Sequence, residues 1–188
     1  MKKIRFNGNI WQAYPHGLDL YPFDYKGRYI KDIVLSNAQL MQANVSEMNL
    51  KIIKLSAFDE DGKEHVVAEF KGRNVLKVKG MFEGNFLRST SVISLGNGSY
   101  RTLRFYLGTT ENSFVYSDRS EKPVFNRKYL DFDIENGLKL NGNESPEVIL
   151  RFNLVPFERR NYIKSILEFF KKYQVVTGKL ANSFNQLF

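Results

Sequence analysis

Four charged residues around one predicted β-hairpin are the part of this chain whose types and spacing could support catalysis. Asp59 and Asp61 stand in the turn of the hairpin, and Glu69 and Lys71 follow on its second strand. Carboxylate oxygens are ligands that Mg²⁺ prefers in proteins, and the lysine adds a cation beside them. These four residues are therefore the candidate catalytic set.

The tripeptide Glu69-Phe70-Lys71, placed after the strand residues 65–68, resembles the core of the metal-dependent PD-(D/E)xK nucleases. The resemblance covers about a dozen residues and implies Mg²⁺-dependent cleavage of nucleic acid. It departs from the family where the partner strand should supply a metal-binding aspartate, since this chain has Leu55-Ser56-Ala57 there. The two aspartates fall in the turn instead.

The same hairpin also has a purely structural interpretation. Alternation along its second strand predicts that Val66, Ala68 and Phe70 are buried, while His65, Glu69 and Lys71 face water. We favour this interpretation, and the nuclease hypothesis stays open beside it.

The sequence lacks the residues and motifs that other classes of enzyme need for catalysis. The chain has no cysteine and two histidines, His16 and His65, without the spacing of a metal-binding motif. Segments 80–84 and 96–98 do not spell a phosphate-binding or dinucleotide-binding loop. We therefore expect no metal and no cofactor.

A second group of candidate residues is aromatic and lies near the N-terminus. Prolines, glycines and aspartates interrupt this stretch, which predicts an extended arm at about residues 8–29 rather than a regular element. Such side chains could pack over the chain's own sheet edge, dock on a neighbouring subunit, or stack on nucleobases or sugars. The candidate binding residues of the arm are Trp11, Tyr14, Tyr21, Phe23 and Tyr25.

The elements that must position these residues are mainly strands. Short apolar runs separated by turn residues fill most of the chain from Lys3 to Leu154. A hairpin is predicted around residues 96–99, with Leu103, Phe105 and Leu107 on one face of its second arm. Residues 50–58, 65–71 and 75–79 are predicted to form a meander, and further strands are expected at 29–35, 114–116, 129–134 and 148–154. Residues 37–48 fit either a short helix or a loop.

These patterns predict a mainly β fold, an antiparallel β-sandwich or jelly-roll-like barrel, as one domain over residues 1–155. After Pro156 the apolar period becomes helical, which predicts a C-terminal amphipathic helix within residues 156–188. This segment would pack on the β-domain or on a neighbouring subunit. Phe184, Leu187 and Phe188 are its candidate docking residues.

Composition narrows the choice of partners. The net charge is +8 and the pI is near 9.5, so acidic partners are favoured, nucleic acid among them. Binding of nucleic acid would fall on Lys71, Arg73, Lys77 and Lys79.

The basic N-terminus has no apolar run typical of a signal peptide, and no stretch is long enough to span a membrane. We expect a cytoplasmic or virion location.

The leading functional hypothesis is a non-enzymatic structural or adaptor subunit of a larger assembly, such as a bacteriophage head–tail, tail or baseplate component. Its partners would be protein subunits, in a homo- or hetero-oligomer. The alternatives are a nucleic-acid-binding protein, with a Mg²⁺-dependent nuclease as its sharper form, and a carbohydrate-binding module that would rest on Trp11 and its neighbouring tyrosines.

Overall fold

A computed structural model describes residues 11–15, 22–70, 75–83, 85–89 and 95–158 of the chain. The chain divides into a unit of residues 1–157 and a unit of residues 158–188. Every element described here lies in the first unit. The predicted C-terminal helix, with Phe184, Leu187 and Phe188, lies outside the described residues.

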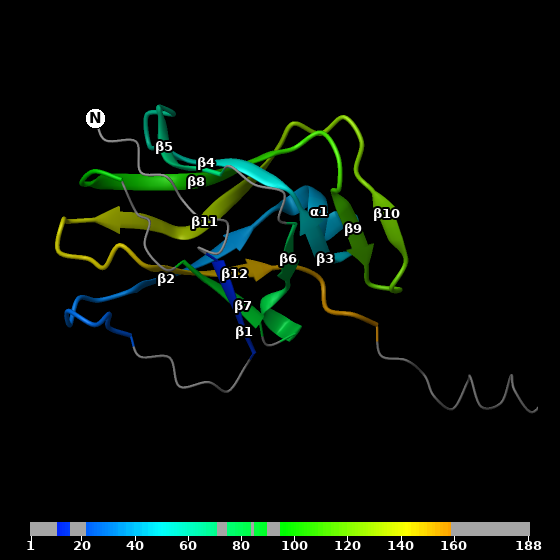
Figure 1. Cartoon of the computed structure of the whole chain (residues 1–188), viewed down its shortest axis with the longest axis horizontal. Helices are drawn as coiled ribbons and strands as arrows, with labels where there is room; N and C mark the ends of the chain where they lie inside the picture. The colour runs from blue at the N-terminus through cyan, green and yellow to red at the C-terminus, as the bar shows by residue number, and fades with distance from the viewer. Residues whose placement is uncertain (1–10, 16–21, 71–74, 84, 90–94, 159–188) are drawn as a thin grey trace, which may run out of the picture. The chain divides into compact units, whose positions relative to one another are not determined.

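Strands dominate the described residues (Figure 1). Their bounds, with one short α-helix and one 3₁₀ turn, are β1 (Trp11–Pro15), β2 (Lys31–Ser36), α1 (Ala38–Gln42), β3 (Val45–Leu50), β4 (Ile52–Asp59), β5 (Glu64–Glu69), β6 (Leu76–Lys79), η1 (Met81–Glu83), β7 (Asn85–Ser89), β8 (Gly98–Leu107), β9 (Ser113–Tyr116), β10 (Glu121–Pro123), β11 (Tyr129–Leu140) and β12 (Val148–Asn153). The predicted mainly β fold is confirmed.

The strands form two curled sheets that together make a half-barrel. The larger sheet has the order β1-β7-β12-β2-β11-β8-β4-β5, and the smaller has the order β10-β9-β3-β6. The expectation of a wholly antiparallel sheet is wrong at one place, because β12 pairs with β2 in parallel over Lys31–Ser36 and Val148–Asn153. The last described strand thus lies in the middle of the larger sheet, between β2 and β7.

One hydrophobic core joins the two sheets. Its centre is a group of three rings, Phe105 on β8, Phe132 on β11 and Phe152 on β12, each almost completely buried. The centroids of Phe105 and Phe132 are 5.4 Å apart, and those of Phe132 and Phe152 are 5.2 Å apart, both edge to face. Met48 on β3 and Val78 on β6 belong to the same core, so side chains of both sheets pack together in it.

Side-chain alternation on β8 follows the sequence prediction. Leu103, Phe105 and Leu107 are buried, while Arg104 and Tyr106 are partly exposed on the opposite face. The first arm predicted for this hairpin includes residues 91–94, which lie outside the described residues.

The inward face predicted for β5 is wrong for Val66. Leu55 pairs with Ala68 and Ser56 pairs with Val66, so Val67 is an extra residue in a β-bulge. The bulge reverses the alternation, and Val67 and Ala68 are buried while Val66 is exposed. His65 was expected to face water, but its half-buried ring lies edge-on to Tyr100, with the centroids 5.4 Å apart.

The predicted meander is also wrong in its third strand. The strand β6 pairs with β3 in the smaller sheet, not with β5 in the larger one. For residues 37–48, the helix alternative is confirmed at Ala38–Gln42, whereas strand β3, which begins at Val45, fits neither the helix nor the loop alternative. Asn37 caps α1 by accepting a hydrogen bond from the Leu40 N–H.

Part of the predicted arm is regular structure. Residues 11–15 form β1, which pairs antiparallel with β7 at the edge of the larger sheet, Trp11 opposite Ser89 and Tyr14 opposite Phe86. The prediction of an arm without regular structure is therefore wrong for this stretch.

Within the described residues, none of the helices has the length and apolar character needed to cross a membrane.

Candidate functional site

Residues 22–30, which we call the aromatic loop, precede β2 and carry two of the predicted binding residues, Phe23 and Tyr25. Phe23 and Tyr29 form an isolated antiparallel bridge, and the Ile30 N–H donates to the Pro22 carbonyl at 2.8 Å. Within the bend, the Gly27 N–H donates to the Asp24 carbonyl at 2.9 Å. Gly27 has a φ of +73°, a left-handed conformation that glycine adopts without strain. The loop is therefore a small closed hairpin.

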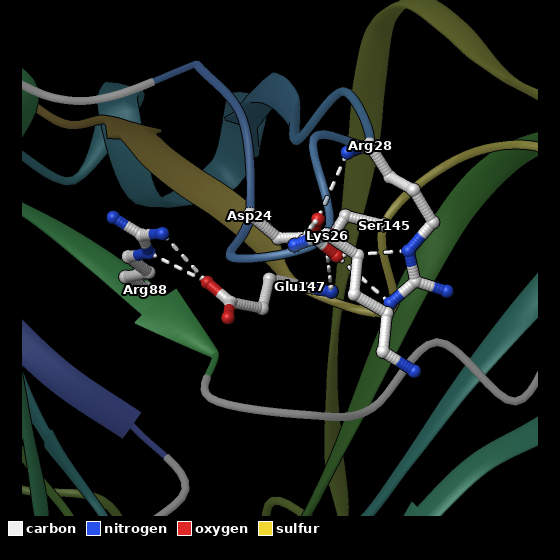
Figure 2. Close-up of polar contacts among 6 residues, drawn as sticks. All are labelled: Asp24, Lys26, Arg28, Arg88, Ser145 and Glu147. Atoms are coloured by element: carbon white, nitrogen blue, oxygen red, sulfur yellow. Dashed lines mark hydrogen bonds and ion pairs between the residues drawn. The ribbon is translucent and has the colours of Figure 1, made fainter.

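The Asp24 carboxylate fixes this hairpin from within (Figure 2). Its Oδ1 accepts hydrogen bonds from the backbone N–H groups of Lys26 and Arg28, both at 2.9 Å. Its Oδ2 accepts from the Arg28 guanidinium, at 2.9 Å from Nε and 2.8 Å from Nη2, and from the Ser145 hydroxyl at 3.0 Å. The Asp24 side chain is almost inaccessible to solvent, at 1% exposed. A buried carboxylate with this many donors holds one conformation of the loop.

Ser145 connects the aromatic loop to the body of the larger sheet. Its hydroxyl donates to Asp24 and accepts from the Glu147 N–H at 3.1 Å, and its own N–H donates to the Tyr29 carbonyl at 2.9 Å. Glu147 in turn makes an ion pair with Arg88 of β7, with 2.7 Å between Nη2 and Oε2 (Figure 2). The loop is thus anchored to the segment just before β12 and, through it, to β7.

The electrostatics of the site agree with this geometry. Burial by itself raises the pKa of Asp24, but the hydrogen bonds from Arg28, Ser145 and Lys26 outweigh it and lower the pKa to about 2. Asp24 is consequently ionised at neutral pH, and its charge is balanced by Arg28.

Aromatic side chains of this anchored loop point into solvent. Tyr25 is 86% exposed, and about half of Phe23 and of Tyr29 is exposed. The Phe23 and Tyr29 rings contact each other edge to face, with centroids 6.0 Å apart. Lys26 lies over the Tyr25 ring at 5.5 Å and Lys31 over the Tyr29 ring at 5.9 Å. The loop presents an aromatic and cationic surface on a fixed backbone.

The other predicted arm residues are placed differently. Trp11 and Tyr14 belong to β1 and Tyr21 lies outside the described residues, so the five predicted residues do not form one arm. Phe23 and Tyr25 share the aromatic loop. Tyr29, at the end of the stretch, joins them there.

The structure does not bring the four candidate catalytic residues together. Glu69 lies opposite Lys54 on β4, and Lys54 is five positions from Asp59 (54 to 59). At about 3.3 Å per residue, Glu69 and Asp59 are therefore roughly 16 Å apart along the sheet. Asp59 accepts hydrogen bonds from the Asp61 and Lys63 N–H groups and contacts His65 Nε2 at 2.7 Å. The hydrogen bond with His65, together with these backbone bonds, lowers the pKa of Asp59. Lys71 lies outside the described residues.

A metal site would need several acidic or histidine side chains close together in the part of the chain that the structure describes. No group of three or more histidine, aspartate or glutamate side chains there could hold a metal ion. Of the four predicted nucleic-acid contacts, Lys71 and Arg73 lie outside that part. Lys77 and Lys79 flank the buried Glu47, with Nζ to carboxylate distances of 2.9 and 3.6 Å, so one carboxylate partly neutralises both.

Sequence reasoning missed the residues that build the site. Asp24 begins an Asp-x-x-Gly turn, and this local signal could have identified its backbone hydrogen bonds. Ser145 has no such signal, because it lies 121 positions away from Asp24.

Comparisons of the chain with protein-family models, with curated proteins and with solved structures found no match.

Proposed function

We propose that this protein is a non-enzymatic structural or adaptor subunit of a larger assembly, and that it docks on a neighbouring protein through the aromatic loop. The observation that carries the proposal is the contrast within that loop. Its backbone is fixed by a buried carboxylate, while the rings of Phe23, Tyr25 and Tyr29 remain exposed to solvent.

This combination is what protein-binding surfaces use. Aromatic residues supply most of the binding energy at many interfaces, because they bury a large area with few rotatable bonds. A loop already held in one conformation loses less entropy on binding than a flexible one. The Asp24 hydrogen bonds would therefore contribute to affinity indirectly, by ordering the loop before a partner arrives.

The charges of the loop favour an acidic partner surface. Arg28 is paired with Asp24, and Lys31 lies 3.5 Å from Glu144. Lys26 contacts the Tyr25 ring and has no carboxylate within 4.0 Å among the described residues. A partner with carboxylates around an apolar pocket would complement Tyr25 and Lys26 together.

In its most specific form, the proposal is a bacteriophage virion component of the head–tail junction, tail or baseplate. The support is compositional: the chain is rich in lysine, asparagine, phenylalanine and tyrosine, which is typical of AT-rich genomes. The finer assignment of the fold to a β-sandwich or jelly-roll-like barrel belongs to the same proposal, supported by the core that the two curled sheets share.

Site-specific photo-crosslinking tests the proposal. A photoreactive phenylalanine derivative replaces Tyr25 in the full chain, which is produced in its native host and irradiated. We expect one defined adduct, with a second copy or with another subunit, because Tyr25 would lie inside the interface. The matched control carries the same group at Phe82, an exposed ring on η1 outside the aromatic loop.

An adduct at position 25 that is absent at position 82 would support docking through the loop. Equal labelling at both positions, or none at position 25, would contradict it. Tyr25→Ala supplies a second readout: if light scattering detects an assembly of the wild-type chain, the variant should not form it, while its thermal unfolding midpoint should be unchanged.

A further inference from the structure

The connection between β10 and β11 contains a run of residues that the proposed function does not use. Phe125-Asn126-Arg127-Lys128-Tyr129 places an amide and two cations between two aromatic residues. All five are exposed, Phe125 the most at 76%. Exposed rings on either side of two cations suit single-stranded nucleic acid, because its bases can stack on the rings and its phosphates are anionic.

Hydrogen bonds of the backbone hold this run at both ends. The Val124 N–H donates to the Asn112 carbonyl at 2.8 Å, and the Leu107 N–H donates to the Lys128 carbonyl at 2.9 Å. Between them, Asn126 has a φ of +59°, a left-handed conformation that asparagine tolerates and that turns the chain. The two cations are therefore presented by a loop with fixed ends.

The loop forms one wall of a groove beside β11, which we call the β11 groove. The groove has a volume of about 670 Å³, and its other walls are the start of α1 and the outward residues of β11. Arg127 and Lys128 line it, and neither has a carboxylate within 4.0 Å among the described residues. Asp131, the nearest acidic residue in sequence, is already held by Arg104 through bonds of 2.6 and 2.7 Å. Asp133, the other acidic residue that lines the groove, accepts a hydrogen bond from the Thr102 hydroxyl at 3.3 Å and makes no ion pair with either cation, so Arg127 and Lys128 are available to an anionic ligand.

The ring of Tyr129 at the end of the run is held in place by its neighbours. The Arg104 guanidinium lies 3.9 Å from the Tyr129 ring centroid and 4.6 Å from that of Phe58. The Tyr106 ring lies beside Tyr129, with centroids 6.0 Å apart. Although Arg104 contacts it, Tyr129 remains 43% exposed. It can therefore serve as a stacking surface with little loss of conformational entropy.

A second hollow continues the path along β11. It has a volume of about 480 Å³, shares Asp133 with the β11 groove, and is lined by Arg101 and Lys139 among others. Arg101 is paired there with Glu60 at 3.7 Å, so Lys139 is the further cation that a longer single strand would meet along the outer face of β11.

The geometry points to the β11 groove as a binding site for single-stranded nucleic acid. Arg127 and Lys128 contact the phosphodiester backbone, and Phe125 and Tyr129 stack on bases. An acidic protein segment would satisfy the two cations but would offer the two exposed rings no flat partner. The rings therefore favour nucleic acid over an acidic peptide, and place the binding on a surface distinct from the lysines around Glu47 and from the aromatic loop.

Fluorescence anisotropy with a labelled oligothymidylate of about 12 nucleotides tests this inference. The full chain and the double variant Arg127→Ala/Lys128→Ala are titrated between about 50 and 200 mM salt. A plot of log affinity against log salt has a negative slope, to which each phosphate contact on a single strand contributes about −0.7. Removing two contacts should therefore make the slope less negative by about 1.4. The matched control is Lys77→Ala/Lys79→Ala, which removes the same formal charge from the smaller sheet.

A second pair of variants tests stacking. Phe125→Ala should weaken binding by about 5- to 150-fold if it removes one base–aromatic stack. Phe82→Ala, which removes an exposed ring elsewhere, should not change it. Circular dichroism and thermal unfolding show that each variant is folded.

Three outcomes would overturn the inference. The wild-type protein fails to bind the oligonucleotide at about 50 mM salt, or the Lys77/Lys79 control loses as much affinity as the Arg127/Lys128 variant. In the third, polyglutamate competes as well as the oligonucleotide and Phe125→Ala has no effect, which would assign the groove to an acidic protein segment instead.

Discussion

At the scale of single residues, two charged side chains hold their neighbours in place on the surface of this protein. Asp24 collects hydrogen bonds from three residues and fixes the aromatic loop. Arg104 makes a bidentate pair with Asp131 and lies against the Phe58 and Tyr129 rings on the outer face of the larger sheet. In both places one charged group orders several neighbours, so each is a sensitive position for substitution.

The Asp24 contacts predict a specific dependence of stability on pH. The folded-state pKa of Asp24 is about 2, below the roughly 3.9 of an unfolded aspartate, so its contribution is fully present above pH 4 and is lost as pH falls toward 2. Asp24→Asn should lower the thermal midpoint at pH 5 to 7. The difference from wild type should shrink between pH 4 and pH 2.

Ser145→Ala provides the internal check on that experiment. It removes one donor to Asp24, so the folded-state pKa of Asp24 should rise toward its unfolded value, and the loss of stability on acidification should be smaller and complete at a higher pH than in wild type. Parallel midpoint curves for wild type and Asp24→Asn throughout pH 2 to 7 would show that Asp24 titrates alike in the folded and unfolded chain.

Arg104 should be intolerant even of a conservative change. Arg104→Ala removes a bidentate, charge-assisted pair and should cost about 1.5 to 3 kcal/mol in the free energy of unfolding by urea. Arg104→Lys keeps the charge but loses the planar fork and its stacking, so it should recover only part of that energy. A lysine variant as stable as wild type would mean that charge alone matters at this position.

At the scale of elements, β11 is shaped by an interruption in its middle. The pairing with β8 shifts register between Asp133 and Leu138, and Asn136 and Gly137 both have left-handed φ values, +64° and +68°. Pairing of β11 with β2 is confined to two residue pairs, Asp133 with Ser36 and Ile134 with Leu35. Pairing with β8 therefore resumes in a shifted register after these left-handed residues.

Substitutions at this irregularity should separate backbone strain from packing. Gly137→Ala places a Cβ on a left-handed residue and should cost about 1 to 2 kcal/mol in urea unfolding. Gly96→Ala, at a glycine with open space around it and no left-handed φ, should change stability by less than about 0.5 kcal/mol. Equal effects of the two would refute a backbone origin.

Local sequence patterns predicted those elements whose geometry is set locally. Strict alternation identified the inner face of β8, and the Asp-Gly turn identified the β4–β5 hairpin. The same alternation failed on β5, because a bulge depends on the register with β4 rather than on the strand itself. Local pattern cannot specify a partner strand either, and for this reason β6 was assigned to the wrong sheet.

The candidate site was harder to predict than the fold. Phe23 and Tyr25 were predicted as binding residues, and the structure shows that both rings are exposed, but the residues that support their loop were not predicted. The hydroxyl that holds Asp24 comes from Ser145, 121 positions later, and serine at that position looks like any other turn residue. Long-range contacts of this kind leave no trace in a single sequence.

At the scale of the whole molecule, stability should depend on the three rings where β8, β11 and β12 meet. Phe132 is fully buried between Phe105 and Phe152. Phe132→Ala should therefore cost about 3 to 5 kcal/mol in urea unfolding, through lost apolar burial and a residual cavity. Phe82→Ala, at an exposed ring, should cost less than about 0.5 kcal/mol. A small loss at Phe132 would mean that the core can collapse around the missing ring.

The position of β12 has a consequence for how the protein is made. Its strand lies between β2 and β7, although it follows both by about 60 or more residues of chain. Until the ribosome has released residue 153, those two strands have no partner between them, and their backbone edges are open to pairing with another nascent chain. The nascent protein is thus vulnerable to misassembly until β12 has been synthesised, and slower translation of the residues before β12 would lengthen that period.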